Sequence, residues 1–456
     1  MARKKVLVLT AYFPPVGGSG AIPTLKLVKY LGEYDCDVLV LTKEPRHNDI
    51  VDPSLLREVP PAVRVVRSRD VDPYRWLYRF RPPAPQAQAA AARPSLSGRV
   101  AAGLLRGLRS PALKILQYTA VPDDFYWWAR ATVPLGEKIV RDEGVDVIFS
   151  NSNPYSVHLL GHRLKRRTGV LWIANFYDPW TQNIHRSGIP WRERIEEQME
   201  QQVMATADAI TTVTPSFAHG FRAKYGNVIR RLEVIYNGFD PADYKDIVPF
   251  PHDGRFTAAY TGLLYPKRSP RVLLEAVGEL VAEGRVRRDE IVLRFAGRFA
   301  TGTLAETRDC VERLGLSGAV EIMGELEHRQ ALGVLKGADL LLLVGDTAPE
   351  AGAYIPGKLF EYMAVRRPIL ALVMPGEASR IVEKYALGRV VHPLDREGIK
   401  RAYLELYRAW KDGREPGGTA AGTGGTDLKI FDRRYQAAQL SRLMDELLAA
   451  RRRGAG

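Results

Sequence analysis

The chain has 456 residues, 46% hydrophobic and 26% charged, which is ordinary for a globular enzyme of two domains. Cys36 and Cys310 stand in no disulfide or zinc-ligand spacing, and no apolar run approaches the roughly 20 residues that span a bilayer, so we expect a cytoplasmic protein that is neither exported nor membrane-spanning. The formal net charge of +14 fits either an anionic partner or a solvated, arginine-rich surface.

The first half of the chain alternates strand-like and helix-like segments. Short hydrophobic runs predict strands at 5–10, 38–42, 145–150, 170–175 and 209–213. Periodic stretches predict helices at 24–31, 155–167 and 191–207. Because this alternation is typical of a parallel sheet covered by helices, we predict a Rossmann-like domain that ends at the turn signal Asn237-Gly238.

The same pattern restarts in the second half. The predicted strands lie at 256–261, 291–296, 320–323, 340–344 and 369–373, and the predicted helices at 270–283, 303–314, 329–336 and 358–364. A Gly/Thr/Ala-rich loop at 413–426 precedes a last helix at 432–448 and the basic tail Arg451–Arg453. We therefore predict two α/β domains, 1–238 and 239–428, facing each other across a cleft, with 429–456 as a C-terminal helix and tail that packs back on the first domain.

A basic insert interrupts the first domain. Residues 73–122 contain no Asp or Glu, and a helical projection from Leu96 places Arg99, Arg106 and Arg109 on one face and apolar residues on the other. Two interpretations stay open: the helix lies on an anionic membrane that presents a lipid-linked acceptor, or it packs on the first domain with a solvated basic face. Liposome binding after these three arginines are changed to glutamate separates the two.

The loop at 14–20, between the first strand and the first helix, contains Gly17 and Gly18. Small residues there let backbone N–H groups close on an anion at a helix N-terminus, so we favour a phosphate site over a purely structural turn. The loop fails as a dinucleotide fingerprint because Pro23 stands where the third glycine belongs.

The second half carries a near match to a P-loop at 352–359, in which Leu359 cannot supply the hydroxyl that holds magnesium. Pro356-Gly357 opens a helix with Lys358 in its first turn, an unfavourable place for a cation unless an anion binds there too. Glu361 lies on the same helical face and can accept hydrogen bonds from a vicinal diol. The alternative is a surface Lys/Glu pair.

A second basic pair, Lys267-Arg268, follows the first strand of the second half. Such a pair can supply the countercharge that a departing nucleotide diphosphate needs, or it can be merely solvated. No metal site is predicted: the Asp-x-Asp triplets at 35–37 and 70–72 are expected in solvated turns, and His158 and His162 have no third partner.

Taken together, three segments resemble glycosyltransferase family 4, retaining enzymes of the GT-B fold: 13–20 resembles its first glycine loop, 234–240 its interdomain segment and 356–363 its donor-binding helix. The resemblance implies that the backbone near 323–326 faces the nucleotide base. The implied donor-binding residues are Gly17, Gly18, Lys267, Gly357, Leu359 and Glu361, and the implied catalytic residues are Arg268, Lys358 and Asp178.

The chain departs from the family pattern at three positions. Ala353 stands where the first of two family glutamates is usual, with Glu350 the nearest acid; Leu263 replaces a basic residue; and Tyr177 replaces a histidine or arginine beside Asp178. Asp178 itself either orients the acceptor or caps a helix.

The resemblance implies a retaining glycosyltransferase that moves a sugar from a nucleotide-diphosphate donor to a hydroxyl of a glycan or lipid-linked acceptor, in polysaccharide biosynthesis, without an obligatory metal or cofactor. We expect it in the cytoplasm or peripherally on the inner membrane face, with no nucleic-acid partner, because its basic residues are not interleaved with aromatics. The alternatives are a nucleotide- or nucleic-acid-binding protein of similar fold without transferase activity and, as a weaker third, a dehydrogenase.

Overall fold

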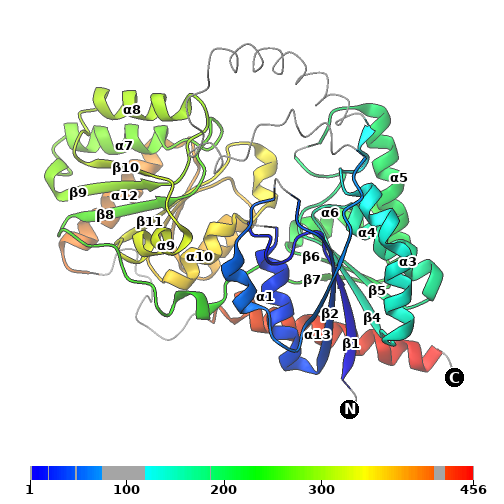
Figure 1. Ribbon diagram of the computed structural model, residues 1–456. Coiled ribbons are helices and arrows are strands. Elements are labelled where there is room, and N and C mark those ends of the chain that lie inside the picture. Colours follow the sequence, from blue (N-terminus) through cyan, green and yellow to red (C-terminus); the bar gives the residue numbers. More distant parts are fainter. Residues whose placement is uncertain are drawn as a thin grey trace, which may run out of the picture. The chain divides into compact units, whose positions relative to one another are not determined.

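The computed structural model describes residues 3–18, 20–46, 49–73, 119–184, 186–414 and 427–454. The chain forms two compact units (Figure 1): unit 1 comprises Met1–Tyr236 with Arg433–Gly456, and unit 2 comprises Asn237–Asp432. The domain boundary expected after residue 238 thus compares with a boundary after residue 236. The helix expected within the basic insert lies outside the described residues.

Unit 1 is built on a seven-stranded parallel sheet in the order β3-β2-β1-β4-β5-β6-β7. Its strands are β1 (Lys4–Leu9), β2 (Cys36–Lys43), β3 (Arg64–Ser68), β4 (Val147–Asn151), β5 (Leu171–Phe176), β6 (Ala209–Thr212) and β7 (Leu232–Val234). Its α-helices are α1 (Ile22–Leu31), α3 (Tyr126–Asp142), α4 (Ser156–Thr168), α5 (Pro190–Thr206), α6 (Pro215–Tyr225) and α13 (Arg433–Gly454).

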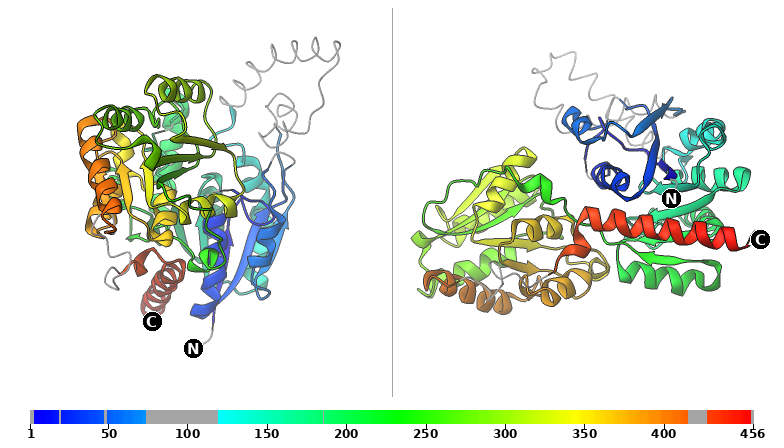
Figure 2. Two further views of the ribbon diagram at one scale, coloured as in Figure 1. Left: turned by 90° about the vertical axis from the view of Figure 1, so that its left-hand side faces the viewer. Right: turned by 90° about the horizontal axis from the view of Figure 1, so that it is seen from below.

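Alternate residues of each strand point to opposite sides of the sheet, and the inner strands carry buried apolar residues on both sides. Helices therefore cover both faces. Leu171 and Ile173 of β5 join the core that α1 and α13 close, through Leu440 among others. Trp172, between them, lies against Gly161 of α4, where a Cβ would come within 2.5 Å of the indole nitrogen. Helix α13, red in Figure 2, continues to Gly454, so the predicted basic tail is its last turn. Cations at this end interact favourably with the helix dipole.

Unit 2 is built on a six-stranded parallel sheet in the order β10-β9-β8-β11-β12-β13. Its strands are β8 (Phe256–Thr261), β9 (Ile291–Ala296), β10 (Val320–Gly324), β11 (Leu340–Val344), β12 (Ile369–Leu372) and β13 (Gly388–Val391). Its α-helices are α7 (Arg271–Ala282), α8 (Thr303–Arg313), α9 (His328–Lys336), α10 (Gly357–Val365), α11 (Glu377–Lys384) and α12 (Arg396–Lys411). The predicted fold class of two parallel-sheet, Rossmann-like domains is confirmed.

The winding of each sheet reverses at one point. In unit 1 the chain moves outward from β1 to β2 and β3, and then restarts on the other side with β4. In unit 2 it moves from β8 to β9 and β10 and restarts with β11. Ligands of open parallel sheets bind outside the carboxyl ends of the strands at such switch points. These two places are therefore the candidate ligand sites.

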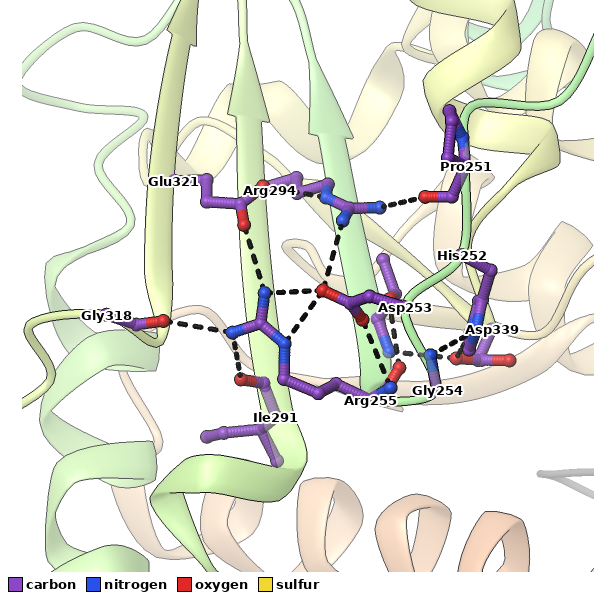
Figure 3. Close-up of polar contacts among 11 residues, drawn as sticks. Pro251, His252, Asp253, Gly254, Arg255, Ile291, Arg294, Gly318, Glu321 and Asp339 are labelled. Carbon is purple, nitrogen blue, oxygen red and sulfur yellow. Dashed lines mark hydrogen bonds and ion pairs between the residues drawn. The ribbon is translucent and has the colours of Figure 1, made fainter.

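The amino end of the unit 2 sheet is held by an ion-pair network that the sequence did not indicate (Figure 3). The guanidinium of Arg255 donates to Asp253 at 2.6 Å and to the carbonyl of Gly318 at 3.0 Å, and Arg294 donates to Glu321 at 2.8 Å. The hydrogen bond from Arg255 is the main cause that lowers the pKa of Asp253 to about 2. This network fastens the segment before β8 and lies away from the strand ends where ligands bind.

Candidate functional site

The loops after β8 and β11 meet at the switch point of unit 2. Tyr265, in the first loop, donates its hydroxyl to Asp346 in the second at 2.7 Å, and the carbonyl of Lys267 accepts the backbone N–H of Thr347 at 2.9 Å. The second loop leads into α10, which carries Lys358 in its first turn. The two predicted basic segments, about 90 residues apart in sequence, therefore belong to one place in the fold.

Glycines let the loops of this edge pack without side chains between them. The N–H of Gly262 donates to Ala296 at 2.7 Å, and the N–H of Gly297 donates to Gly324 at 2.6 Å. Gly262 and Gly297 have φ of 119° and 133°, which L side chains rarely adopt, and a Cβ on Gly297 would overlap the carbonyl oxygen of Gly262. Gly297 is thus required by the close approach of the loops after β8 and β9, and Gly262 by its own backbone conformation.

Lys358 reaches back under the β8 loop. A Cβ on Gly262 would overlap its Cε and lie 2.5 Å from its Nζ, so the lysine fills the space that the glycine leaves. Its ammonium also lies 5.0 Å from the ring centre of Tyr260. Burial, and then the charge of Arg268, lower the pKa of Lys358 to about 8. The site is therefore a half-buried positive centre whose two cations repel each other until an anion joins them.

Arg268 is held by a tight turn. Its backbone N–H donates to the carbonyl of Tyr265 at 2.7 Å, and its guanidinium lies 5.0 Å from the ring centre of Tyr265. Its Nε is buried and has no hydrogen-bond partner among the described residues. Lys267, the other member of the predicted pair, is exposed. The structure thus directs Arg268 inward and leaves Lys267 at the surface.

The remaining predicted residues of unit 2 lie on α10 and differ in their surroundings. Gly357 is exposed at its start, with no atom within 4 Å of a Cβ built there. Glu361 is half-buried, and burial raises the pKa of its carboxyl, while His328 at the start of α9 and Lys358 act in the opposite direction. Leu359 differs: its side chain is fully buried and its N–H donates to Pro356 at 2.9 Å, so neither group faces a ligand. Leu359 anchors the helix that carries its neighbours.

The glycine loop of unit 1 is closed by its own chain. The N–H of Gly17 donates to the carbonyl of Ile50 at 2.8 Å, and Val16 forms an isolated antiparallel bridge with Val51. A Cβ on Gly17 would lie 3.1 Å from the Cβ of Asp52. Close packing in a structural turn therefore accounts for Gly17, and a phosphate contact by Gly18, whose φ is 83°, stays a prediction.

A cavity of about 450 Å³ lies at the switch point of unit 1. It is lined from the carboxyl ends of β1 and β4 by Tyr12 and Asn153, and from the segments around them by aromatic, acidic and basic side chains. Among these, Asp123 accepts the backbone N–H groups of Phe125 and Ser156, each at 3.0 Å. Burial nevertheless raises the pKa of Asp123 to about 6. The cavity thus combines aromatic rings with acidic and basic groups that can bind hydroxyls.

Asp178 lies beside this cavity, after the end of β5. Its carboxylate accepts the side-chain amide of Asn153 at 3.0 Å, and two residues on, Trp180 stacks on Tyr155 with ring centres 4.9 Å apart. The alternative that Asp178 caps a helix is wrong, because the next helix, α5, begins at Pro190 with Ile189 as its N-cap residue.

A buried carboxylate that was not predicted from the sequence lies behind this segment. Glu200 of α5 is fully buried and accepts the hydroxyls of Thr181 and Tyr225, while Lys224 lies 3.8 Å away. Thr181 follows Trp180 directly, so this network fixes the loop that lines the cavity. In the sequence, Glu200 is one of several glutamates on a polar helix, and no local pattern distinguishes it from the others.

The prediction that the acidic triplet at 70–72 is solvated is wrong. Arg46 binds Asp70 at 2.7 Å and lies 3.8 Å from Asp72, whose side chain is 2% exposed. Asp37 of the other triplet pairs with Arg3 at 2.6 Å in an exposed position. The second triplet is thus part of a half-buried ion-pair cluster centred on a single arginine.

Residues 20–238 match the family described as glycosyl transferase 4-like domain, and residues 255–409 match the glycosyl transferases group 1. D-inositol 3-phosphate glycosyltransferase 2 of Catenulispora acidiphila is 24% identical over 195 residues, which span 40% of this chain and 44% of that protein. The aligned part thus covers less than half of the relative's length.

Solved structures share the fold over almost the whole chain. Sucrose-phosphate synthase of Thermosynechococcus elongatus has a TM-score of 0.61 at 15% identity and covers 98% of this chain and 100% of its own. Anabaena HepE in complex with UDP has a TM-score of 0.60 at 15% identity, with 97% and 100% covered. A glycosyltransferase from Rickettsia africae has a TM-score of 0.62 at 12% identity, with 98% and 99% covered.

Two parallel sheets of this order, each with a switch point at its carboxyl edge, are the arrangement of the GT-B fold that these solved structures share. Together with the two family matches, they show that the chain belongs to the glycosyltransferase family 4-like proteins. Within the described ranges, no helix has the length and apolar character needed to cross a membrane.

Proposed function

We propose that this protein transfers a sugar from a nucleotide-diphosphate sugar to a hydroxyl acceptor with retention of the anomeric configuration, without an obligatory metal. The observation that carries the proposal is the convergence of Arg268 and Lys358 at the switch point of unit 2. Two cations, both drawn out of water, supply fixed countercharge where the donor diphosphate would leave. A metal ion is then not needed for that task.

Each donor-side residue has a role that fits its position. The Lys358 ammonium binds a phosphate oxygen as a point charge, and the guanidinium of Arg268 can bind two oxygens side by side. Glu361, one helical turn after Lys358, accepts hydrogen bonds from the ribose diol of the nucleotide. The departing phosphate, stabilised by the two cations, takes the proton of the acceptor hydroxyl on the same face of the sugar.

The acceptor side of the proposal rests on unit 1. The cavity at its switch point presents stacked aromatic rings of Tyr155 and Trp180, surfaces on which a sugar ring can lie. Asp178, held by Asn153, orients the attacking hydroxyl. We propose a glycan or lipid-linked acceptor in polysaccharide biosynthesis, with the protein in the cytoplasm or peripherally on the membrane through its basic insert.

Donor hydrolysis tests the proposal most directly. The protein is incubated with a panel of nucleotide-diphosphate sugars, UDP sugars first because Anabaena HepE has been crystallised with UDP and with UDP-glucose. We expect one donor to release its sugar, with NMR showing the retained anomer before mutarotation. Thermal stabilisation by an oligonucleotide, with neither hydrolysis nor stabilisation by any nucleotide diphosphate, would instead support the binding-protein alternative.

Asp178→Asn tests the acceptor side. The change removes the charge that holds the acceptor hydroxyl, and the loss of a hydrogen bond to a charged group costs about 1.5–3 kcal/mol, or roughly 10- to 150-fold in kcat/KM for the acceptor. Donor binding, measured by calorimetry, should be unchanged, because Asp178 is assigned to the acceptor and not to the donor. The matched control is Asp146→Asn, another unit 1 carboxylate, which accepts the N–H of Lys5 at the opposite edge of the sheet. Equal losses in both variants would contradict the assigned role.

A further inference from the structure

Unit 1 has a second cavity, of about 450 Å³, that its proposed acceptor site does not use. It lies between α4 and α5, on the outer side of α4, and its lining includes His162, Arg163, Arg166, Arg167, Met199 and Gln202. The four α4 residues recur at helical spacing, so they form one stripe. Gly161, which packs on Trp172, marks the opposite face of the helix that touches the sheet.

The stripe carries more positive charge than its surroundings neutralise. Arg167 pairs with Glu137 of α3 at 2.9 Å, and the side chain of Arg163 lies over the ring of Tyr126 at 5.4 Å. Arg166 is exposed, and no carboxylate lines the cavity. Two cationic side chains, Arg163 and Arg166, thus face a hollow with no described acid on its wall.

Two nitrogen atoms of the stripe are also unsatisfied. Nη1 of Arg163 and Nδ1 of His162 are buried and have no hydrogen-bond partner among the described residues. A buried donor without a partner costs about 1–3 kcal/mol, and more when it is charged. Burial, and then Arg166 and Arg163, lower the pKa of His162, which shows that the cluster already opposes further positive charge.

Stabilisation of the helix end does not explain this arrangement. Arg166 and Arg167 lie in the last turn of α4, where cations interact favourably with the helix dipole. His162 and Arg163 lie a turn earlier, half-buried, and their unsatisfied nitrogens gain nothing from the dipole. An anion in the cavity would supply an acceptor for Arg163 and would favour protonation of His162.

We propose that the α4–α5 cavity is a binding site for a phosphate group, separate from the donor site of unit 2. Arginine pairs bind phosphate through several N–H groups in a fixed plane, which suits a small tetrahedral anion. The group can come from a soluble phosphate or from the headgroup of an anionic lipid, and the chemistry of recognition is the same for both.

The test follows the His162 imidazole signal in the full-length protein labelled with ¹³C-histidine, because His162 lines this cavity and its signal reports on binding there. Inorganic phosphate should shift the signal saturably toward the imidazolium form. In the double variant Arg163→Gln/Arg166→Gln, the apparent Kd should rise at least tenfold. The matched control, Arg451→Gln/Arg452→Gln, removes the same charge from the exposed end of α13, on the opposite face of the sheet, and should keep the wild-type Kd.

Vesicles of phosphatidylcholine with phosphatidic acid distinguish the two sources. If they compete with phosphate for the His162 signal, and Arg163→Gln/Arg166→Gln abolishes the competition, the ligand is a lipid headgroup. If they do not compete, it is a soluble phosphate. The proposal is overturned by a wild-type signal that does not saturate, or by a double variant that binds phosphate as the control does. Arg166→Gln alone, at an exposed position, covers the case in which the double variant fails to fold.

Discussion

Lys358→Ala is expected to lower kcat about 100- to 1000-fold, since removal of one preorganised group that stabilises transition-state charge costs roughly 3–4 kcal/mol. The ammonium lies in a half-buried place next to Arg268, where water cannot replace it fully. Arg268→Ala should have an effect of the same order, because the departing diphosphate would lose the other half of its countercharge. Turnover with the donor found by the hydrolysis panel is the measurement.

The same lysine gives the donor affinity a pH dependence. Its pKa of about 8 means that the free protein loses this charge as the pH rises above 8, well below the ordinary pKa of a lysine. A bound diphosphate holds the proton on, so the Kd for the nucleotide diphosphate should rise up to tenfold per pH unit above about 8 and stay nearly constant from about pH 7 to 8, where phosphate is ionised.

Lys358→Arg is the control for the pH dependence. A guanidinium does not titrate in this range, so its Kd should be flat across the same pH interval, whatever its absolute value. Calorimetric titration of both proteins with the nucleotide diphosphate gives the comparison. If the Kd of Lys358→Arg also rises above pH 8, another group titrates there. That result would contradict a contact between Lys358 and the diphosphate.

Sequence periodicity predicted the strands of both sheets except β3, β7 and β13, which are short edge strands with largely half-exposed residues. The strands β8, β9 and β11 have the predicted bounds, because runs such as Leu340–Val344 are buried on both faces and are therefore apolar throughout. From these strands and from the turn signals after them, the sequence also placed Arg268 just after a strand and Lys358 in the first turn of a helix. Their presence at one switch point then followed from the order of the strands.

The sequence could not predict contacts between loops that are far apart along the chain. The hydrogen bond from Tyr265 to Asp346 joins residues 81 positions apart, and its members are ordinary turn residues in isolation. The prediction that the acidic triplet at 70–72 is solvated was wrong for the same reason. Arg46, in one loop, neutralises acids in another loop. Burial of a polar side chain depends on what the fold places around it, and no local pattern records that.

Gly262→Ala is expected to reduce kcat/KM for the donor almost as far as Lys358→Ala does, although the glycine itself binds nothing. Its new Cβ would overlap Cε of Lys358 and lie 2.5 Å from Nζ, so the ammonium must leave its place beside Arg268. The fold should survive, because the obstructed group is the flexible end of a side chain. A part of the cost is backbone strain at a φ of 119°, about 1–3 kcal/mol.

Gly284→Ala separates strain from displacement. Gly284 also belongs to unit 2 and has a positive φ of 68°, but a Cβ there meets no atom within 4 Å. This control should lower thermal stability and leave kcat/KM unchanged. If it reduces activity as Gly262→Ala does, loss of stability rather than loss of the lysine's position explains the effect.

A double-mutant cycle then asks through which group Gly262 acts. If the glycine serves only to make room for the ammonium, its replacement should cost nothing further once the ammonium is gone, so Gly262→Ala/Lys358→Ala should match Lys358→Ala within about twofold in kcat/KM. If the two losses multiply instead, Gly262 acts through the backbone of the loops after β8 and β9. The expected coupling makes the loop glycine a positioning residue, and it ties the rate to the single lysine that α10 presents.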